Sequence, residues 1–166
     1  KLCFLYAPFF HEALKNVAQI RKKLAVPTIF NFLGPLLNPA NTSTQLIGTS
    51  RKDTMQKIAA VVSESRNSAY IVHGFDGMDE ITLSDNSYLL RVENGKIFEE
   101  EIINPEKFGF KKIALDKLKG GNAQYNASRL ISLLDGEKGA YRDIVILNAA
   151  LALKLAKKVK EIEEGI

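Results

Sequence analysis

Apolar and polar residues follow one another along the chain in blocks that predict alternating strands and helices. Short apolar runs at residues 44–49 and 69–74 predict two strands, and the amphipathic stretch 51–65 between them predicts a helix. A strand, a helix and a second strand at this spacing are typical of a βαβ unit, whose two strands are parallel. We therefore expect an α/β fold with a mostly parallel sheet and helices packed on it.

Other segments add a hairpin, a further strand and more helices. Residues 87–102 alternate apolar and polar side chains around Asn94-Gly95, a pair that favours a two-residue hairpin turn. The run "LCFLYA" at residues 2–7 is closed by Pro8 and predicts a buried strand that would also bury Cys3. Helical periods cover residues 12–25, 122–136 and 139–159.

Composition narrows the class of protein. Of the 166 residues, 46% are hydrophobic and 25% are charged, as in ordinary soluble domains with a core. No apolar run is long enough to cross a bilayer and no signal-peptide pattern is present, so we expect a cytoplasmic protein without a membrane partner. The lone thiol, Cys3, cannot form an internal disulfide, which agrees with a reducing compartment.

The basic charge raises the possibility of a nucleic-acid partner. The net charge is +4, but the lysines are scattered among 19 acidic residues. No aromatic side chains interleave with a basic patch, as proteins that bind single strands require. We expect no nucleic-acid partner. A solvated surface is the better explanation of the basic charge, and binding of anionic small molecules is the next.

Arg21 is the one charge within the apolar arc of the helix predicted at 12–25. A guanidinium in that position is costly to desolvate unless it is paired. One interpretation is a structural salt bridge, or a side chain that reaches the rim. The other is a planar donor held for a carboxylate or phosphate ligand. Periodicity alone leaves the two equally supported.

The stretch "HGFDGMDEITL", residues 73–83, places Asp76, Asp79 and Glu80 within five residues, directly after a predicted strand. One interpretation is an acidic turn, for which Asp76-Gly77 is suited. The other is a cation site, because ligands of α/β proteins lie beyond the carboxyl ends of strands. His73, at the strand end, is expected to serve packing.

Four segments resemble one family, anthranilate phosphoribosyltransferase. They are "HEALKNVAQIRKKLAVPTIFNFLGPLLNPA", "QLIG", "VHGFDGMDEIT" and "RDIVILNAALAL", and they occur in the order of the family. The resemblance implies transfer of the phosphoribosyl group from phosphoribosyl pyrophosphate to anthranilate, a step of tryptophan biosynthesis. This displacement requires positioned substrates and a neutralised leaving group, with no enzyme nucleophile, so no catalytic residue is assigned.

The resemblance also assigns binding residues. Arg21 corresponds to the arginine that binds anthranilate, and Gly34-Pro35 to the bend that lines the same site. His11 corresponds to a histidine on that substrate's route, although one continuous helix would separate it from Arg21 by about 15 Å. Either the helix begins after His11, or His11 lines the entrance.

A further implied site is a magnesium site. Asp79 and Glu80 match the family's acidic pair, which binds Mg²⁺ carried by phosphoribosyl pyrophosphate, and Mg²⁺ needs one or two carboxylates besides phosphates and water. The loop "GGNAQYNA" resembles the family's loop before a helix, where Asn122 is expected to cap.

The family's glycine-rich phosphate loop is absent from the sequence, so we expect a C-terminal fragment that is inactive alone. The expected division is residues 1–10, a strand of the α/β domain; 11–40, helices that lead to the small helical domain and line the anthranilate site; and 41–166, the C-terminal part of the phosphoribosyltransferase domain. The full-length enzyme would be a homodimer. A pyrimidine nucleoside phosphorylase and a non-catalytic nucleic-acid-binding relative of the same fold are the alternatives.

Overall fold

The computed structural model describes residues 3–12, 16–17, 20, 23–24, 26, 28, 33–65 and 68–166. The chain divides into two compact units, Lys1–Ser43 and Thr44–Ile166, and each is described by itself.

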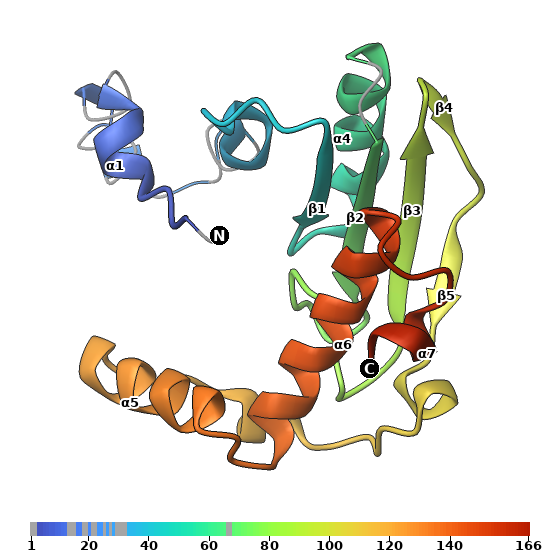
Figure 1. The fold of residues 1–166 in the computed structure, drawn as a ribbon. Helices are drawn as coiled ribbons and strands as arrows, with labels where there is room; N and C mark the ends of the chain where they lie inside the picture. Colours follow the sequence, from blue (N-terminus) through green and yellow to red (C-terminus); the bar gives the residue numbers. More distant parts are fainter. Residues whose placement is uncertain are drawn as a thin grey trace. The chain divides into compact units, whose positions relative to one another are not determined.

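The second unit is built on a five-stranded sheet in the order β1-β2-β3-β4, with β5 also paired to β3 (Figure 1). The strands are β1 (Thr44–Gly48), β2 (Ser68–Gly74), β3 (Ser87–Glu93), β4 (Lys96–Ile97) and β5 (Glu101–Ile103). Strands β1 and β2 are parallel and are joined by helix α4 (Lys52–Glu64), so the predicted βαβ unit is confirmed. The α/β class is confirmed as well.

The sheet is mixed, whereas a mostly parallel one was expected. Strand β3 is antiparallel to β2, and β4 and β5 are antiparallel to β3. Residues 75–86, which join β2 to β3, contain no helix and turn the chain back, whereas a parallel return needs a longer crossover. The predicted hairpin is present, with Asn94 and Gly95 at φ values of 52° and 79°, as its tight turn requires.

Helices cover both faces of this sheet (Figure 1). Tyr70 and Val72 of β2 belong to the core formed with α6 (Ala140–Leu155) and α7 (Ile162–Gly165). Because side chains alternate across a strand, Ala69 and Ile71 point to the other face, where α4 contacts β2 and β3. The result is a three-layer arrangement that buries both faces of β2.

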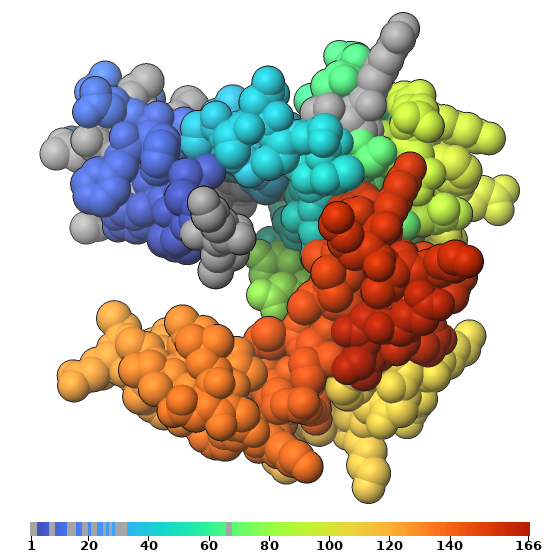
Figure 2. Space-filling view, in the orientation of Figure 1, coloured from blue at the N-terminus to red at the C-terminus, as the bar shows by residue number. Residues whose placement is uncertain are grey.

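Smaller elements connect β5 to α6. They are η2 (Pro105–Phe108), η3 (Leu115–Leu118) and α5 (Ala123–Leu134). No residue of α5 is buried, and its atoms stand at the surface in the space-filling view (Figure 2). Asn122 caps this helix as expected, because its side-chain oxygen accepts a hydrogen bond from the Tyr125 amide at 2.9 Å.

The prediction of a strand at residues 2–7 is wrong for the described residues 3–7. Residues 3–6 have no regular structure, and α1 (Ala7–Phe10) follows them. Cys3 is exposed instead of buried, and Phe4 is 86% exposed. The ring centroid of Tyr6 lies 5.3 Å from that of Phe9 and 6.4 Å from that of Phe4, so these rings contact one another while they remain exposed.

Helical structure is present in the first unit at Glu12, Asn16–Val17, Ile20 and Lys23–Leu24, the described residues of the helix expected at 12–25. A short helix η1 (Gly34–Leu37) follows. Within the described part of the chain, no helix is long and apolar enough to span a membrane.

Candidate functional site

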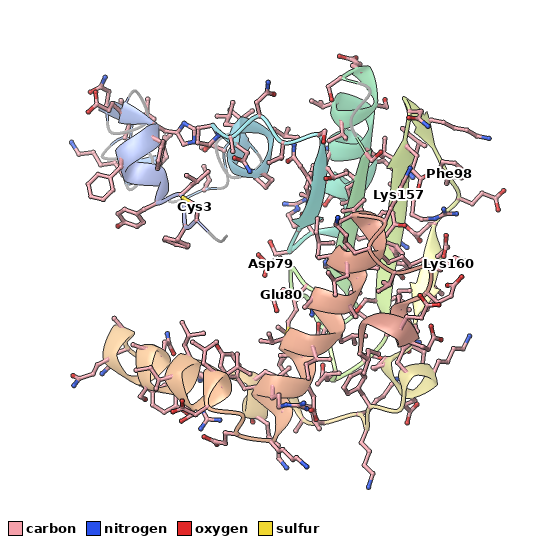
Figure 3. The ribbon with its side chains drawn as sticks, in the orientation of Figure 1. Cys3, Asp79, Glu80, Phe98, Lys157 and Lys160 are labelled. Carbon is pink, nitrogen blue, oxygen red and sulfur yellow. The ribbon has the colours of Figure 1, made fainter. Side chains whose placement is uncertain are left out.

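Asp79 and Glu80 lie next to each other on the loop that follows β2, near the end of β1 and beside α6 (Figure 3). Both side chains are exposed, and the part of the chain that the structure describes offers neither of them a hydrogen bond or an ion pair. Two carboxylates without partners repel each other, an arrangement that a cation would relieve.

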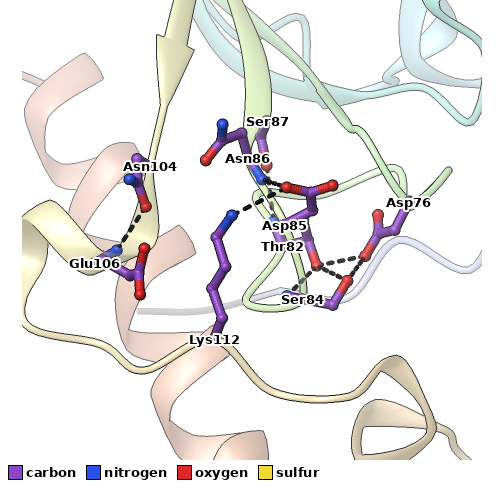
Figure 4. A network of polar contacts seen from close by, with 9 residues as sticks. All are labelled: Asp76, Thr82, Ser84, Asp85, Asn86, Ser87, Asn104, Glu106 and Lys112. Carbon is purple, nitrogen blue, oxygen red and sulfur yellow. Dashed lines mark hydrogen bonds and ion pairs between the residues drawn. The ribbon is translucent and has the colours of Figure 1, made fainter.

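The turn before this pair is fixed by Asp76 (Figure 4). One oxygen of Asp76 accepts the Met78 amide at 3.0 Å, and the other accepts the hydroxyl of Thr82 at 2.6 Å and that of Ser84. Thr82 is fully buried, and its own amide donates to the Ser87 hydroxyl at 3.0 Å. Asp76 therefore closes the loop, and the turn expected at Asp76-Gly77 is confirmed, with Gly77 at a φ of 94°.

Desolvation acts to raise the pKa of Asp76, but the hydrogen bonds from Ser84, Thr82 and the Met78 amide outweigh it and hold this pKa below its usual 3.8. A carboxyl whose pKa is lowered by folding stabilises the fold above its unfolded pKa. That stabilisation disappears as the pH falls through the folded pKa.

The variant Asp76→Asn is therefore expected to lose about 1–3 kcal/mol of the free energy of unfolding at neutral pH, because charged hydrogen bonds to two hydroxyls are removed. Its difference from the wild type should stay constant down to about pH 5 and shrink below the ordinary pKa of 3.8. Denaturant titrations over this pH range measure both quantities.

Asp85→Asn is the matched control, because Asp85 lies on the same loop with an exposed ion pair to Lys112 at 3.1 Å (Figure 4). It should destabilise less, as exposed pairs contribute little. An equal decrease in the free energy of unfolding in the two variants would contradict the role given to Asp76.

Gly48, the last residue of β1, brings the strand against the acidic loop. A Cβ built on Gly48 would lie 1.6 Å from the Asp79 carbonyl oxygen, a distance that no side chain can occupy. The absence of a side chain at Gly48 thus lets the Asp79 backbone rest directly on the sheet.

Asn148 of α6 contacts the residue that follows Glu80. Its side-chain oxygen accepts the Ile81 amide at 3.0 Å, and its side-chain nitrogen donates to the Ile81 carbonyl at 2.9 Å. The same nitrogen also donates to the Ile144 carbonyl at 2.9 Å, one turn earlier on α6. Ile81 is fully buried, so its main chain and its side chain are both anchored.

His73 serves packing, as expected. It is 9% exposed, its Nδ1 lies 2.8 Å from the Thr49 carbonyl oxygen, and its ring stacks on Tyr88 across the sheet.

The acidic pair suits a hard divalent cation. Although the side chain of Glu80 reaches solvent, partial desolvation raises the pKa of its carboxyl, and the charge of Asp79 raises it further. The described residues contain no group of three or more acidic, histidine or cysteine side chains that would enclose a metal. Two carboxylates on a rigid loop fit Mg²⁺, which takes few protein ligands and fills its shell with water and phosphate.

The other predicted site residues belong to the first unit. Arg21 lies outside the described residues. Gly34 and Pro35 open η1, and a Cβ on Gly34 would meet none of the described atoms beyond its chain neighbours. His11 is half-buried and not helical, whereas Glu12 is helical, which agrees with a helix that begins after His11.

Gly48 and Asn148 were not predicted from the sequence as parts of this site. A glycine at the end of a strand is a known signal of close backbone approach. Asn148 carries no such signal, because its partner Ile81 is 67 residues away in the sequence.

A hollow of about 680 Å³ lies elsewhere, between η3, α5 and α6. Its lining includes Lys117, Tyr125 and Arg129 but neither Asp79 nor Glu80. Since a site for a charged, metal-bound ligand requires the carboxylates, we assign the candidate site by its chemistry and not by the size of this hollow.

The sheet carries helices on both faces, and the acidic pair at the carboxyl ends of β1 and β2 has no polar partner among the described residues. These features define an α/β domain suited to a metal-bound anionic ligand. The chain belongs to the glycosyl transferase family, a/b domain, whose family model matches residues 1–166.

Its relatives are anthranilate phosphoribosyltransferases, so the resemblance seen in the sequence is confirmed. The chain is 44% identical to that of Thermoanaerobacter sp. over 164 residues, which are 98% of this chain and 48% of the relative. It is 46% identical to that of Clostridium beijerinckii over 166 residues, 99% of this chain and 49% of the relative. The chain thus spans about half the length of these relatives.

Solved structures of anthranilate phosphoribosyltransferases are also similar to this chain. The anthranilate phosphoribosyltransferase of Thermus thermophilus matches with a TM-score of 0.88 and 35% identity, over 98% of this chain and 48% of that one. The Saccharomyces cerevisiae enzyme, in a structure with PRPP and Mg, matches with a TM-score of 0.87 and 28% identity, over 98% of this chain and 47% of that one.

Proposed function

We propose that this chain is the C-terminal part of an anthranilate phosphoribosyltransferase. The complete enzyme transfers the phosphoribosyl group from phosphoribosyl pyrophosphate to anthranilate, giving phosphoribosylanthranilate and pyrophosphate in tryptophan biosynthesis. The observation that carries the proposal is the exposed pair Asp79 and Glu80, held on a fixed backbone in a chain 44% identical to a relative of that name. The enzyme would work as a homodimer in the cytoplasm, and the fragment alone would be inactive.

In this proposal, Asp79 and Glu80 hold the Mg²⁺ that accompanies phosphoribosyl pyrophosphate. When bound, the ion neutralises negative charge on the pyrophosphate leaving group. The two carboxylates orient that end of the substrate, and the turn closed by Asp76 keeps their backbone from moving as charge develops. No residue of this chain is given the role of a nucleophile.

The aromatic acid is assigned to the first unit. Arg21 would bind the anthranilate carboxylate with a planar pair of donors. Gly34 and Pro35 would line the site, and a close approach of the ligand to the Gly34 backbone is supported by the absence of described atoms within 4 Å of a Cβ built there. His11 would lie on the route of the same substrate.

Arg21→Ala is expected to raise the KM for anthranilate about tenfold or more, since a charged hydrogen bond contributes roughly 1.5–3 kcal/mol. The KM for phosphoribosyl pyrophosphate should change less than about twofold. Steady-state kinetics of the complete protein measure both values. The neighbouring cation variant Lys23→Ala is the control, and an unchanged anthranilate KM with a large loss of stability would favour the structural salt bridge instead.

The proposed activity is tested by mixing the complete protein with anthranilate, phosphoribosyl pyrophosphate and Mg²⁺ and following anthranilate fluorescence. We expect a magnesium-dependent decrease with the complete protein and none with the isolated chain. Phosphorolysis of thymidine or uridine, without anthranilate turnover, would identify a nucleoside phosphorylase. Salt-sensitive binding of single-stranded DNA, without turnover of any of these substrates, would identify a nucleic-acid-binding relative.

A further inference from the structure

The main chain around the acidic pair is held from both sides, while the two carboxylates make no hydrogen bond or ion pair with the described residues. Gly48 supports the Asp79 carbonyl from the sheet. On the other side of the pair, the two hydrogen bonds from Asn148 hold the Ile81 peptide groups, at 3.0 and 2.9 Å.

The geometry points to Asn148 as a positioning residue for the magnesium site: its side-chain amide holds the Ile81 peptide groups and thereby fixes where Glu80 and Asp79 present their carboxylates. This inference rests on the proposed function. Asn148 would not touch the ion, because its amide oxygen and nitrogen are both engaged by main-chain groups.

The amide of Asn148 replaces the partner that a neighbouring strand would supply. Ile81 lies outside the strands, so its N–H and C=O have no sheet partner, and Ile81 is fully buried. Buried main-chain groups without hydrogen bonds are costly, and a side-chain amide can satisfy one donor and one acceptor at once. The bond from Asn148 to the Ile144 carbonyl restricts the amide further, so it can serve as a rigid support.

A support of this kind affects the metal through geometry. Mg²⁺ requires near-ideal octahedral placement of its ligands, so a small displacement of one carboxylate weakens binding. Residues that orient metal ligands from outside typically change metal affinity or activity by about 10–100-fold when they are replaced. A residue that served only general packing would alter stability without a selective effect on magnesium.

The test compares Asn148→Ala and Asn148→Leu with the wild type in the complete protein. Asn148→Leu keeps most of the side-chain volume, so it separates the hydrogen bonds from a cavity. We expect both variants to raise the Mg²⁺ concentration for half-maximal turnover by about tenfold or more. The KM for anthranilate should stay within about twofold.

A second measurement requires neither metal nor activity. Hydrogen exchange of the Ile81 amide, followed by NMR, should accelerate by about tenfold in both variants, because that amide loses its acceptor. Amides at the centre of β2 should keep their protection, which shows that the fold persists.

Asn126→Ala is a matched control, because Asn126 of α5 makes the same two-bond contact with the main chain of Gly121, at 2.8 and 3.0 Å. Its magnesium dependence should equal that of the wild type. Faster Ile81 exchange with unchanged magnesium dependence in the Asn148 variants would overturn the inference while the proposed function stands. An inactive wild type would instead overturn the proposed function.

Discussion

Replacing Asp79 by Asn together with Glu80 by Gln is expected to reduce magnesium-dependent turnover of the complete protein by about 10²–10³-fold or more, the loss typical of removing one group that stabilises transition-state charge. Both substitutions keep the size of the side chain and remove its charge. The wild-type carboxylates lack hydrogen bonds and ion pairs to any described residue, so their loss leaves no polar group of the fold unsatisfied. The free energy of unfolding should therefore stay unchanged or rise slightly, since a repulsion disappears.

The measurement is turnover as a function of Mg²⁺ concentration, beside a denaturant titration of the same variant. The control is Glu163→Gln with Glu164→Gln, an adjacent and exposed acidic pair at α7 that changes the net charge by the same amount. It should leave turnover within about twofold of the wild type. A magnesium response that persists in the Asp79 and Glu80 variant would remove the metal assignment.

Gly48→Ala is expected to displace the loop of the magnesium site although it alters no carboxylate. Its Cβ would lie 1.6 Å from the Asp79 carbonyl oxygen, so the loop must move away from β1. Overpacking of this kind costs about 1–3 kcal/mol of the free energy of unfolding. Because Asp79 is displaced with its backbone, the Mg²⁺ concentration for half-maximal turnover should rise by about tenfold or more.

Denaturant titration and magnesium-dependent kinetics measure the two effects in one variant. Thr44→Ala is the control, since Thr44 begins the same strand, is exposed and lies at its other end. Surface changes of this kind alter stability by less than about 0.5 kcal/mol. Gly48→Ala with wild-type stability and kinetics would mean that the loop does not rest on β1 in the working protein.

Local patterns in the sequence were sufficient to predict most of the second unit. The βαβ unit β1-α4-β2 and the turn at Asn94-Gly95 follow from periodicity and from the preference of two residues for positive φ, both properties of short segments. The antiparallel direction of β3 was not predictable in this way, because it depends on the path of the whole loop between β2 and β3.

The strand expected at residues 2–7 shows the limit of an apolar run as evidence. Such a run predicts buried side chains, yet here the rings of Phe4, Tyr6 and Phe9 contact one another within a few residues and stay exposed. The contacts that hold the loop of the acidic pair could not be predicted from the sequence for a related reason. Asp76 was recognised as a turn residue, yet its hydroxyl partners and the contact of Asn148 with Ile81 arise only when distant segments fold together.

The main chain of this site is held by several contacts, whereas its two carboxylates have no polar partner in the described part of the chain. Asp76, Gly48 and Asn148 each fix the main chain of the loop and leave the carboxylates of Asp79 and Glu80 exposed. Such preorganisation suits catalysis by positioning and electrostatics, because ligand groups need not be rearranged when the substrate binds.

The central claim is that Asp79 and Glu80 hold the metal of phosphoribosyl pyrophosphate. It is tested most directly by a crystal structure of the complete protein with that substrate and Mn²⁺, whose anomalous scattering locates the ion. We expect an anomalous peak within about 2.5 Å of a carboxylate oxygen of Asp79 or Glu80, or one water molecule away and joined to the pyrophosphate. A bound substrate whose metal lies away from both residues would contradict the account.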